Sequence, residues 1–347
     1  MAVFNSMMSD NAPLISVIMS TFNSEKYIQE AIESILKQTY SHFEFLIRDN
    51  ASTDSTAKII RSFHDPRIIF FENDANLGYV SNLNTMINAA QGKYIARQDA
   101  DDISCKYRFE KQIVFMERHP EIGACGTFAK IFGTRKGYFA GYMTDAEIRA
   151  SMIIENQMVS SSMMIRKDVF HYGLRFDENF MPAEDYKMWF EIMKSYKLAN
   201  LPHCLVKYRV HHSNFSKKKA AVQLKNAMQV RGQIIEYFFP SLEKDFQQQL
   251  SCLLTPYQLL TNENLRGIQK IFYKLKVSTS RQPINRTILS YELFKQWTII
   301  CLRNKTESFH CMLKIYFTSH LLSLRFVFPF LFDMIKRHTY IFLFSIN

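Results

Sequence analysis

Segments typical of β-strands alternate with amphipathic helical segments along the first hundred residues of the chain. The strand-like segments are 14–19, 43–47, 67–71 and 93–97. Apolar residues recur at helical spacing in the segments between them, which are 24–36, 52–63 and 79–90. A short apolar strand is typical of a sheet buried on both faces, and strands that alternate with helices form parallel sheets. The pattern therefore predicts an α/β fold in which helices flank a parallel sheet.

Polar residues follow three of these predicted strands. They are Thr21 and Asn23, on either side of Phe22, after the first strand, Asp49 and Asn50 after the second, and Asp99, Asp101 and Asp102 after the fourth. In parallel sheets, ligands bind outside the carboxyl ends of the strands. Neither GxxxxGK[ST] nor GxGxxG occurs in the chain, so a metal ion is the natural alternative for holding a diphosphate. The sequence predicts a nucleotide pocket at this edge of the sheet.

The acidic segment Asp99-Ala100-Asp101-Asp102 has two interpretations. Three carboxylates within four positions repel one another unless a cation lies between them. An Asp-x-Asp pair offers hard oxygen ligands to Mg²⁺ or Mn²⁺. The alternative is an acidic turn that caps the helix after it. The other polar strand ends favour the cation site.

The rest of the chain predicts further elements and then a change of composition. Helices are expected at 104–119 and 145–154, strands at 122–132 and 160–165, and a loop at 133–141. After Lys217-Lys218-Lys219 the chain predicts helices from 221 to about residue 275, and from Ile288 onward it is rich in Phe, Leu, Ile and Tyr. We therefore expect an α/β domain at 13–216 and a helical region at 217–347.

The segment 288–347 also has two interpretations. Its most apolar part is 321–332, and Lys305, Lys314 and Arg325 are interspersed around it. These residues form either a helical subdomain packed on the α/β domain or a basic and aromatic surface that contacts an anionic membrane. Both interpretations stay open at this point.

Composition narrows the classes of protein. Hydrophobic residues make up 47% and aromatic residues 14% of the chain, which is enough for a core and excludes wholesale disorder. The net charge of +11 favours an anionic partner, whether nucleotide, nucleic acid or acidic lipid. The six cysteines are scattered without a CxxC pair, as in reduced proteins. Since neither a signal peptide nor an apolar run of about 18 residues is visible, we expect a cytoplasmic protein. Peripheral contact at the inner face of the cell membrane is left open.

A set of motifs over residues 13–216 resembles, in order, the family 2 glycosyltransferases of GT-A fold. This inverting group includes enzymes of bacterial surface polysaccharides. The motifs are Ser16 to Asn23, Asp49 to Asp54, Asn76-Leu77-Gly78, Gly92 to Asp102, Arg108 to Gln112, Glu184 to Trp189 and Tyr208 to His211. The chain departs from the family at Asp49-Asn50-Ala51, where Asp-Asp-Gly is more common. The resemblance implies a Rossmann-like, nucleotide-sugar-binding mixed sheet flanked by helices, followed by a C-terminal helical region.

The resemblance also implies roles for residues of the nucleotide pocket. Asp49 is expected to read a uracil-type base, and Thr21 with Phe22 to line the base and the ribose. Asp99 is expected to face the ribose and the diphosphate, and Asp101 to be the direct ligand of Mn²⁺ or Mg²⁺. The expected donor-nucleotide set is completed by Asn23, Asn76 and Ala100.

Two later motifs carry the other expected roles. Glu184 and Asp185 begin a predicted helix, where acidic side chains can serve only to interact favourably with the helix dipole. An inverting transfer needs a base that takes the proton of the attacking hydroxyl, and the resemblance implies that Asp185 is this base, with Glu184 beside it. Tyr208-Arg209-Val210-His211-His212 contains adjacent histidines, which point to opposite faces of a strand. The resemblance favours His211 for contact with the metal or the diphosphate.

Together these observations predict a metal-dependent inverting glycosyltransferase. Its donor is a nucleotide-diphosphate sugar, with a UDP-sugar preferred, and its acceptor is a hydroxyl of a cell-surface glycan or a lipid-linked acceptor. The alternative enzyme is a sugar nucleotidyltransferase, which usually carries a glycine-rich basic loop that Ser20 to Lys26 does not resemble. A basic nucleic-acid-binding protein would explain the charge but not three carboxylate centres. No nucleic-acid partner is therefore expected.

Overall fold

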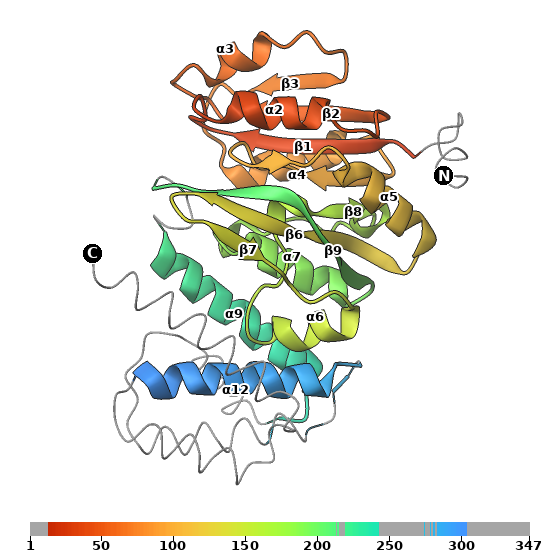
Figure 1. Ribbon diagram of the computed structural model, residues 1–347, viewed down its shortest axis with the longest axis vertical. Coiled ribbons are helices and arrows are strands. Elements are labelled where there is room, and N and C mark those ends of the chain that lie inside the picture. The colour runs from red at the N-terminus through yellow and green to blue at the C-terminus, as the bar shows by residue number, and fades with distance from the viewer. Residues whose placement is uncertain are drawn as a thin grey trace. The chain divides into compact units, whose positions relative to one another are not determined.

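The computed structural model describes residues 13–212, 214, 219–242, 274, 278, 280–281 and 283–303 (Figure 1). The chain divides into two compact units. The first comprises 1–148 and 156–230, and the second comprises 149–155 and 231–347. The boundary predicted between 216 and 217 stays a prediction. Within the described residues, no helix combines the length and apolar character needed to cross a bilayer.

A mixed sheet forms the centre of the first unit. Among the described residues its strands are β1 (Ile15–Thr21), β2 (Phe43–Asp49), β3 (Ile68–Glu72), β4 (Tyr94–Arg97), β5 (Ile103–Ser104), β6 (Ile122–Gly133), β7 (Gly137–Phe139), β8 (Met164–Arg166) and β9 (Lys197–Val210). They pair in the order β3-β2-β1-β4-β8-β6-β9-β5, and β7 lies beside β6. Strands β1 to β4 are parallel, whereas β8 is antiparallel to β4 and to β6. The expected α/β fold with a mixed sheet is confirmed.

The burial pattern explains these elements. The described helices are α2 (Ile28–Leu36), α3 (Thr56–Arg61), α4 (Tyr79–Ala89), α5 (Arg108–Arg118), α6 (Asp145–Met152), α7 (Glu184–Met193), α9 (Ala220–Phe238) and α12 (Arg286–Arg303). All residues of β1 and β4 are buried, as expected of strands covered on both faces. Helix α2 buries Ile28, Ala31, Ile32 and Ile35. Its outer face keeps a Glu33–Lys37 pair at 2.7 Å, so the apolar stripe directs it onto the sheet.

The helix expected at 104–119 begins later than predicted. Ile103 and Ser104 pair with β9 as the short strand β5, and helix α5 starts only at Arg108. The interpretation of the acidic segment as the cap of this helix is therefore wrong, because Tyr107 is the residue before its first turn. Backbone pairing with a strand about a hundred residues later decided the local structure, and local propensity does not report such pairing.

Two other segments also differ from expectation. The loop expected at 133–141 contains β7, which folds back on β6 in antiparallel register. The strand expected at 160–165 begins as a 3₁₀ turn over Ser160–Ser162, and only Met164–Arg166 joins the sheet. The hydroxyls of these serines bond to Asp185, Asp102 and Val159 and hold the turn in place.

The second unit has its own apolar core. Ile234, Ile235, Phe238 and Phe239 are buried there, as are Leu289 and Leu293 of α12. Leu289 and Leu293 are thus buried residues of a helix, and both interpretations of 288–347 stay predictions. Residues 304–347, which include the apolar segment 321–332, lie outside the described residues.

Candidate functional site

Two neighbouring strand ends place the predicted base-binding residues side by side. Thr21 and Asp49 are the last residues of β1 and β2 and are paired in register. Asp49 is buried, and its Oδ1 and Oδ2 accept hydrogen bonds from Ser52 Oγ at 2.5 Å and Ser52 N at 2.9 Å. Thr21 is also buried, and its Oγ1 has no hydrogen-bond partner among the described residues. Phe22 is exposed, so an aromatic ring borders this edge of the sheet.

The loops after β1 and β2 are locked to each other. Asn23 Oδ1 accepts the N–H of Thr53, and the N–H of Asn23 donates to Ser52 Oγ, both at 2.9 Å. The side-chain oxygen of Asn23 therefore holds the loop. Asn23 and Ala51 both have left-handed backbone, with φ of 49° and 62°. This conformation costs a residue with a Cβ about 1–2 kcal/mol, which explains why glycine is more common at the position of Ala51 in the resembling family.

A chain of asparagines supports the next loop. Asn50 Nδ2 donates to Asn76 Oδ1 at 2.8 Å, and Asn50 Oδ1 accepts from Leu77 N at 2.9 Å. Asn73 Nδ2 donates to Asn50 Oδ1 at 3.2 Å and to Asn82 Oδ1 at 2.9 Å. Because an ionised aspartate cannot donate, only the amide at position 50 can hold Asn76 in this way. The departure from Asp-Asp-Gly thus fits this chain's own hydrogen bonds.

Two buried side chains, Gln98 and Arg108, hold the backbone of the acidic loop after β4. Gln98 Nε2 donates to the carbonyl oxygens of Asp99 and Asp102 at 3.1 and 2.9 Å. Arg108 donates to Gln98 Oε1 at 3.2 Å and to the carbonyl oxygen of Arg97 at 2.9 Å. The first residue of α5 therefore fixes the loop backbone. Ala100 is buried in it.

The three aspartates of this loop have different surroundings. Asp99 and Asp101 are half-buried, whereas Asp102 is buried. Asp102 Oδ2 accepts from Ser161 Oγ, and its Oδ1 accepts the N–H of Arg209 at 2.7 Å. Burial and the neighbouring Asp101 raise the pKa of Asp102 well above its usual range. Asp102 therefore ties the loop to β9, and Asp99 and Asp101 are the carboxylates that a ligand can reach.

The end of β9 brings His211 to the acidic loop. His211 Nε2 lies 2.8 Å from Asp101 Oδ2, and Asn214 Nδ2 donates to the same oxygen at 3.2 Å. Arg209 Nε donates to the carbonyl oxygen of Asp101 at 2.8 Å, and its guanidinium stacks on Tyr27 at 4.6 Å. Burial and the charge of Asp99 raise the pKa of Asp101. Asp101 and His211, which we predicted as metal ligands, are thus direct neighbours.

The donor set around Asp101 suits a cation that is shared with a substrate. In the described part of the chain, no group of three or more His, Cys, Asp and Glu side chains is spaced to hold a metal ion. Mg²⁺ is commonly held by one or two carboxylates together with substrate phosphates and water. A carboxylate with an imidazole fits this pattern, and it needs diphosphate oxygens to complete the coordination.

Glu184 and Asp185 open α7, as predicted, and differ in access. Glu184 is 7% exposed, whereas Asp185 is half-buried and can meet a substrate. Asp185 Oδ2 accepts from Asn156 Nδ2 and Ser160 Oγ, each at 3.1 Å, and Oδ1 accepts the N–H of Tyr186 at 2.6 Å. Burial raises the pKa of Asp185, and burial with the neighbouring Asp185 raises the pKa of Glu184 to about 7.

The raised pKa of Glu184 predicts a pH-dependent stability. The folded chain binds this proton more tightly than the unfolded chain, whose glutamate pKa is near 4.5. Between these values the unfolded chain binds fewer protons, so stability falls as pH rises through this range. We expect Glu184→Gln to stabilise the protein by about 1–3 kcal/mol at pH 8 and hardly at pH 5. Thermal unfolding of variant and wild type across this range measures the difference, and a pH-independent difference would contradict the prediction.

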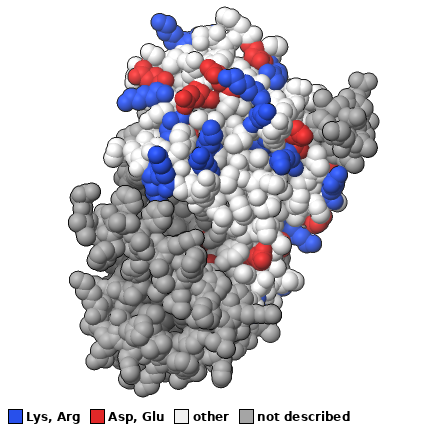
Figure 2. All heavy atoms as spheres, viewed as in Figure 1, with Lys and Arg blue, Asp and Glu red and all other residues white. Residues whose placement is uncertain are grey.

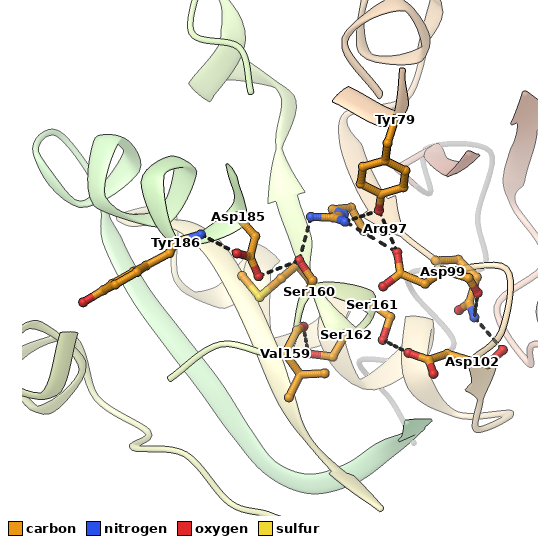
Figure 3. A network of polar contacts seen from close by, with 12 residues as sticks. Tyr79, Arg97, Asp99, Asp102, Val159, Ser160, Ser161, Ser162, Asp185 and Tyr186 are labelled. Carbon is orange, nitrogen blue, oxygen red and sulfur yellow. Dashed lines mark hydrogen bonds and ion pairs between the residues drawn. The ribbon is translucent and has the colours of Figure 1, made fainter. Parts of the chain in front are cut away.

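Arg97 links the two acidic centres. It is the last residue of β4 and is 1% exposed. Its Nη1 donates to Ser160 Oγ at 2.6 Å, and its Nη2 donates to Tyr79 OH at 2.5 Å. Tyr79 OH in turn donates to Asp99 Oδ1 at 2.9 Å. Figure 3 shows the continuous network from Asp99 through Tyr79, Arg97 and Ser160 to Asp185.

Sequence analysis did not identify five residues of this site. They are Tyr79, Arg97, Asn156, Ser160 and Asn214. One signal was available, because an arginine at the end of a strand that is buried on both faces requires a counter-charge. The other four have no such signal, since their roles depend on partners 18 to 113 residues away.

Comparisons with known proteins show the family to which the chain is similar. A family model described as glycosyl transferase family 2 matches residues 16–177. A Haemophilus influenzae protein named as an uncharacterized glycosyltransferase is 31% identical over 79% of this chain and 89% of its own length. The Escherichia coli UDP-Glc:alpha-D-GlcNAc-diphosphoundecaprenol beta-1,3-glucosyltransferase WfgD is 28% identical over 64% of this chain and 87% of its own.

The fold is similar to that of a solved glycosyltransferase structure. Staphylococcus aureus TarS 1–349 in complex with UDP-GlcNAc superposes with a TM-score of 0.57 and 17% identity. The match covers 82% of this chain and 90% of that one. At this identity the likeness concerns the fold alone, and it supports the expected GT-A architecture.

Proposed function

The chain belongs to the family 2 glycosyltransferases, and from this premise we propose which reaction it catalyses. The reaction is an inverting transfer of a sugar from a UDP-sugar to a hydroxyl of a lipid-linked or cell-surface glycan. One observation carries the proposal: two reachable carboxylates after β4 and a reachable carboxylate at the start of α7 are joined through one buried arginine. Donor and acceptor chemistry can meet between such groups.

On the donor side, the paired strand ends form the base and ribose region. Asp49 reads the base, while Thr21 and the exposed ring of Phe22 line it. Asp99 faces the ribose and diphosphate, and Asn23, Asn76 and Ala100 shape the loops around them. The UDP-sugar preference draws support from WfgD, whose name states a UDP-Glc donor, and from TarS, which was solved with UDP-GlcNAc.

Asp101 and His211 would hold a divalent cation, Mn²⁺ or Mg²⁺, once a nucleotide diphosphate supplies further oxygens. Bound there, the cation would neutralise the charge that develops on the departing diphosphate. The 2.8 Å contact between Asp101 Oδ2 and His211 Nε2 keeps both ligands together. Asn214 donates to the same carboxylate and orients it.

Asp185 is the better base of the acidic pair. The acceptor hydroxyl attacks the anomeric carbon from the side opposite the diphosphate, and Asp185 takes the hydroxyl proton. Glu184 is buried behind it and cannot reach an acceptor as easily. Burial, together with the charge of Asp185, raises the pKa of Glu184 to about 7. Glu184 therefore keeps its proton up to about neutral pH, and Asp185 carries the negative charge of the pair.

A relative and the charge distribution support the proposed acceptor and the proposed membrane contact. WfgD acts, by its name, on a diphosphoundecaprenol-linked sugar. Residues 217–347 contain 19 Lys and Arg against 7 Asp and Glu, while residues 1–216 contain 24 against 25. The whole positive excess therefore lies outside the catalytic region, where each basic residue near an anionic membrane adds about 1 kcal/mol. Binding of the full chain to anionic vesicles, compared with neutral vesicles and with high salt, checks this contact.

The rival functions explain less. The family assignment removes the sugar nucleotidyltransferase. On the face that Figure 2 shows, the Lys and Arg side chains of the described residues are interspersed with Asp and Glu, and among these residues they do not form a continuous positive stripe. A nucleic-acid-binding surface would need such a stripe.

A thermal-shift panel of nucleotide sugars, with and without Mn²⁺, tests the proposal. We expect UDP and at least one UDP-sugar to stabilise the protein, with a larger shift in the presence of Mn²⁺. GDP-sugars serve as the control for base recognition. Equal shifts with UDP-sugars and GDP-sugars would contradict the assignment of the donor.

A further inference from the structure

Arg97 donates hydrogen bonds to two hydroxyl groups, and each of these hydroxyl groups donates in turn to a carboxylate. Tyr79 OH accepts from Arg97 Nη2 at 2.5 Å, and Ser160 Oγ accepts from Arg97 Nη1 at 2.6 Å. A guanidinium can only donate, so each hydroxyl must direct its single proton elsewhere. Tyr79 donates to Asp99 Oδ1 at 2.9 Å, and Ser160 donates to Asp185 Oδ2 at 3.1 Å.

The hydrogen bonds of Asp185 leave one position open. A carboxylate offers about four lone-pair positions, two on each oxygen. Oδ2 uses both of its positions, for Asn156 and Ser160, whereas Oδ1 uses one, for the N–H of Tyr186. Among the described residues, no other donor reaches Oδ1. Figure 3 shows Ser160 between Arg97 and Asp185.

We propose that Arg97, acting through Ser160, is a positioning residue that keeps Asp185 in its base form and leaves Oδ1 as the oxygen that takes the acceptor proton. Through Tyr79, the same arginine orients Asp99 on the donor side. This inference rests on the proposed function. In the step, the acceptor O–H bond breaks and its proton goes to Asp185 Oδ1. The acceptor oxygen bonds the anomeric carbon, and the electron pair of the breaking C–O bond leaves with the nucleoside diphosphate.

The charged groups around Asp185 are mostly acidic, so a nearby cation is needed to keep its carboxylate ionised. Glu184 lies beside it on α7, Asp99 and Arg97 face it from the end of β4, and Tyr208 faces it from β9. Arg97 is the one cation among these groups. Burial opposes the charge of Arg97, but Tyr79 and the carboxylates Asp99, Glu184 and Asp185 raise its pKa, so the guanidinium stays charged throughout the working range.

Three full-length variants separate the two arms of the network. UDP affinity measures the donor arm, and the pH dependence of UDP release from UDP-glucose or UDP-N-acetylglucosamine, with water as acceptor, measures the base. Ser160→Ala removes a hydrogen-bond donor to the ionised carboxylate of Asp185, and this raises the pKa of the base. The acid limb of the pH–rate profile, where the rate falls because the base is protonated, should therefore move up by about one pH unit. UDP affinity should stay within about twofold. In Tyr79→Phe, UDP affinity should fall about tenfold, and the acid limb should not move.

Arg97→Lys keeps the charge but cannot hold both hydroxyls in one plane, so it should change both readouts. Ser160→Thr, which retains the hydroxyl, should restore the acid limb. Ser162→Ala is the matched control, because Ser162 lies in the same turn and, among the described residues, its hydroxyl bonds to Thr127 and Val159 and not to Asp185 or Arg97. It should leave the pH profile unchanged even if stability falls.

The outcomes distinguish this inference from the proposed function. An unmoved acid limb in Ser160→Ala, or a loss of UDP affinity in that variant, overturns the positioning role while the glycosyltransferase site stands. A shifted limb in Ser162→Ala overturns it as well, since a general disturbance of the turn would then explain both variants. If the wild type binds UDP but releases none from either sugar, the proposed donors are wrong and the inference falls with them.

Discussion

Replacing Asp101 with alanine is expected to reduce sugar transfer by at least about 10³-fold, because a lost electrostatic stabiliser of a developing negative charge costs about 10²–10³ in rate and the cation would also lose its carboxylate ligand. The fold should survive. Asp101 is half-buried, and the loop backbone is held by Gln98 and Arg209 independently of the Asp101 side chain. Turnover of a UDP-sugar and UDP affinity with and without Mn²⁺ are the measurements.

The control for Asp101→Ala is Asp168→Ala, which removes an aspartate side chain that is 61% exposed. The control should retain full activity and the Mn²⁺ dependence of UDP binding. In Asp101→Ala that dependence should vanish. Full transfer activity in Asp101→Ala would remove this residue from the site, and His211 would then lack its proposed role.

Asp185→Asn is expected to lower turnover by about 10²–10⁴, the range typical for loss of a general base. The side chain keeps its size but cannot take a proton. Three donors face Asp185, so the new amide must oppose at least one of them. We therefore also expect a loss of stability of about 1–3 kcal/mol. Single-turnover rates, UDP affinity and thermal unfolding separate these effects.

Asp177→Asn makes the same chemical change in an aspartate that only caps a 3₁₀ turn at Asn179. Turnover should not change in this control. UDP affinity of Asp185→Asn should stay near that of the wild type, because the proposed role of Asp185 concerns the acceptor. Normal turnover combined with weak UDP binding would place Asp185 on the donor side and make Glu184 the better candidate for the base.

The sequence was sufficient for the first half of the sheet, because β1 to β4 follow from local apolar periodicity. It failed where distant partners decide the conformation. Ser160, Ser161 and Ser162 have the pattern of a strand, yet their hydroxyls bond to Asp185, Asp102 and Val159 and hold a tight turn. Periodicity cannot report such contacts.

The candidate site was also predicted only in part. The strand-end rule located Thr21, Asp49 and the acidic loop, and the family resemblance added Asp185 and His211. Neither source identified Arg97 as a link, although the residue was read as the end of a strand. Its importance follows from Tyr79 and Ser160, which approach it from segments 18 and 63 residues away.

The contact between Asp101 and His211 has a consequence for chain growth. The two residues are 110 positions apart, whereas the strands that form the base region are complete by Arg97. Contacts between distant segments close late, since the entropy of the intervening loop opposes them. During synthesis, a nascent chain can therefore assemble the proposed base-recognition region well before the proposed cation ligands Asp101 and His211 are both present. Mn²⁺-dependent UDP binding would then appear only after the last long strand, β9, has folded. A chain that ends before this strand would not bind the diphosphate through a cation.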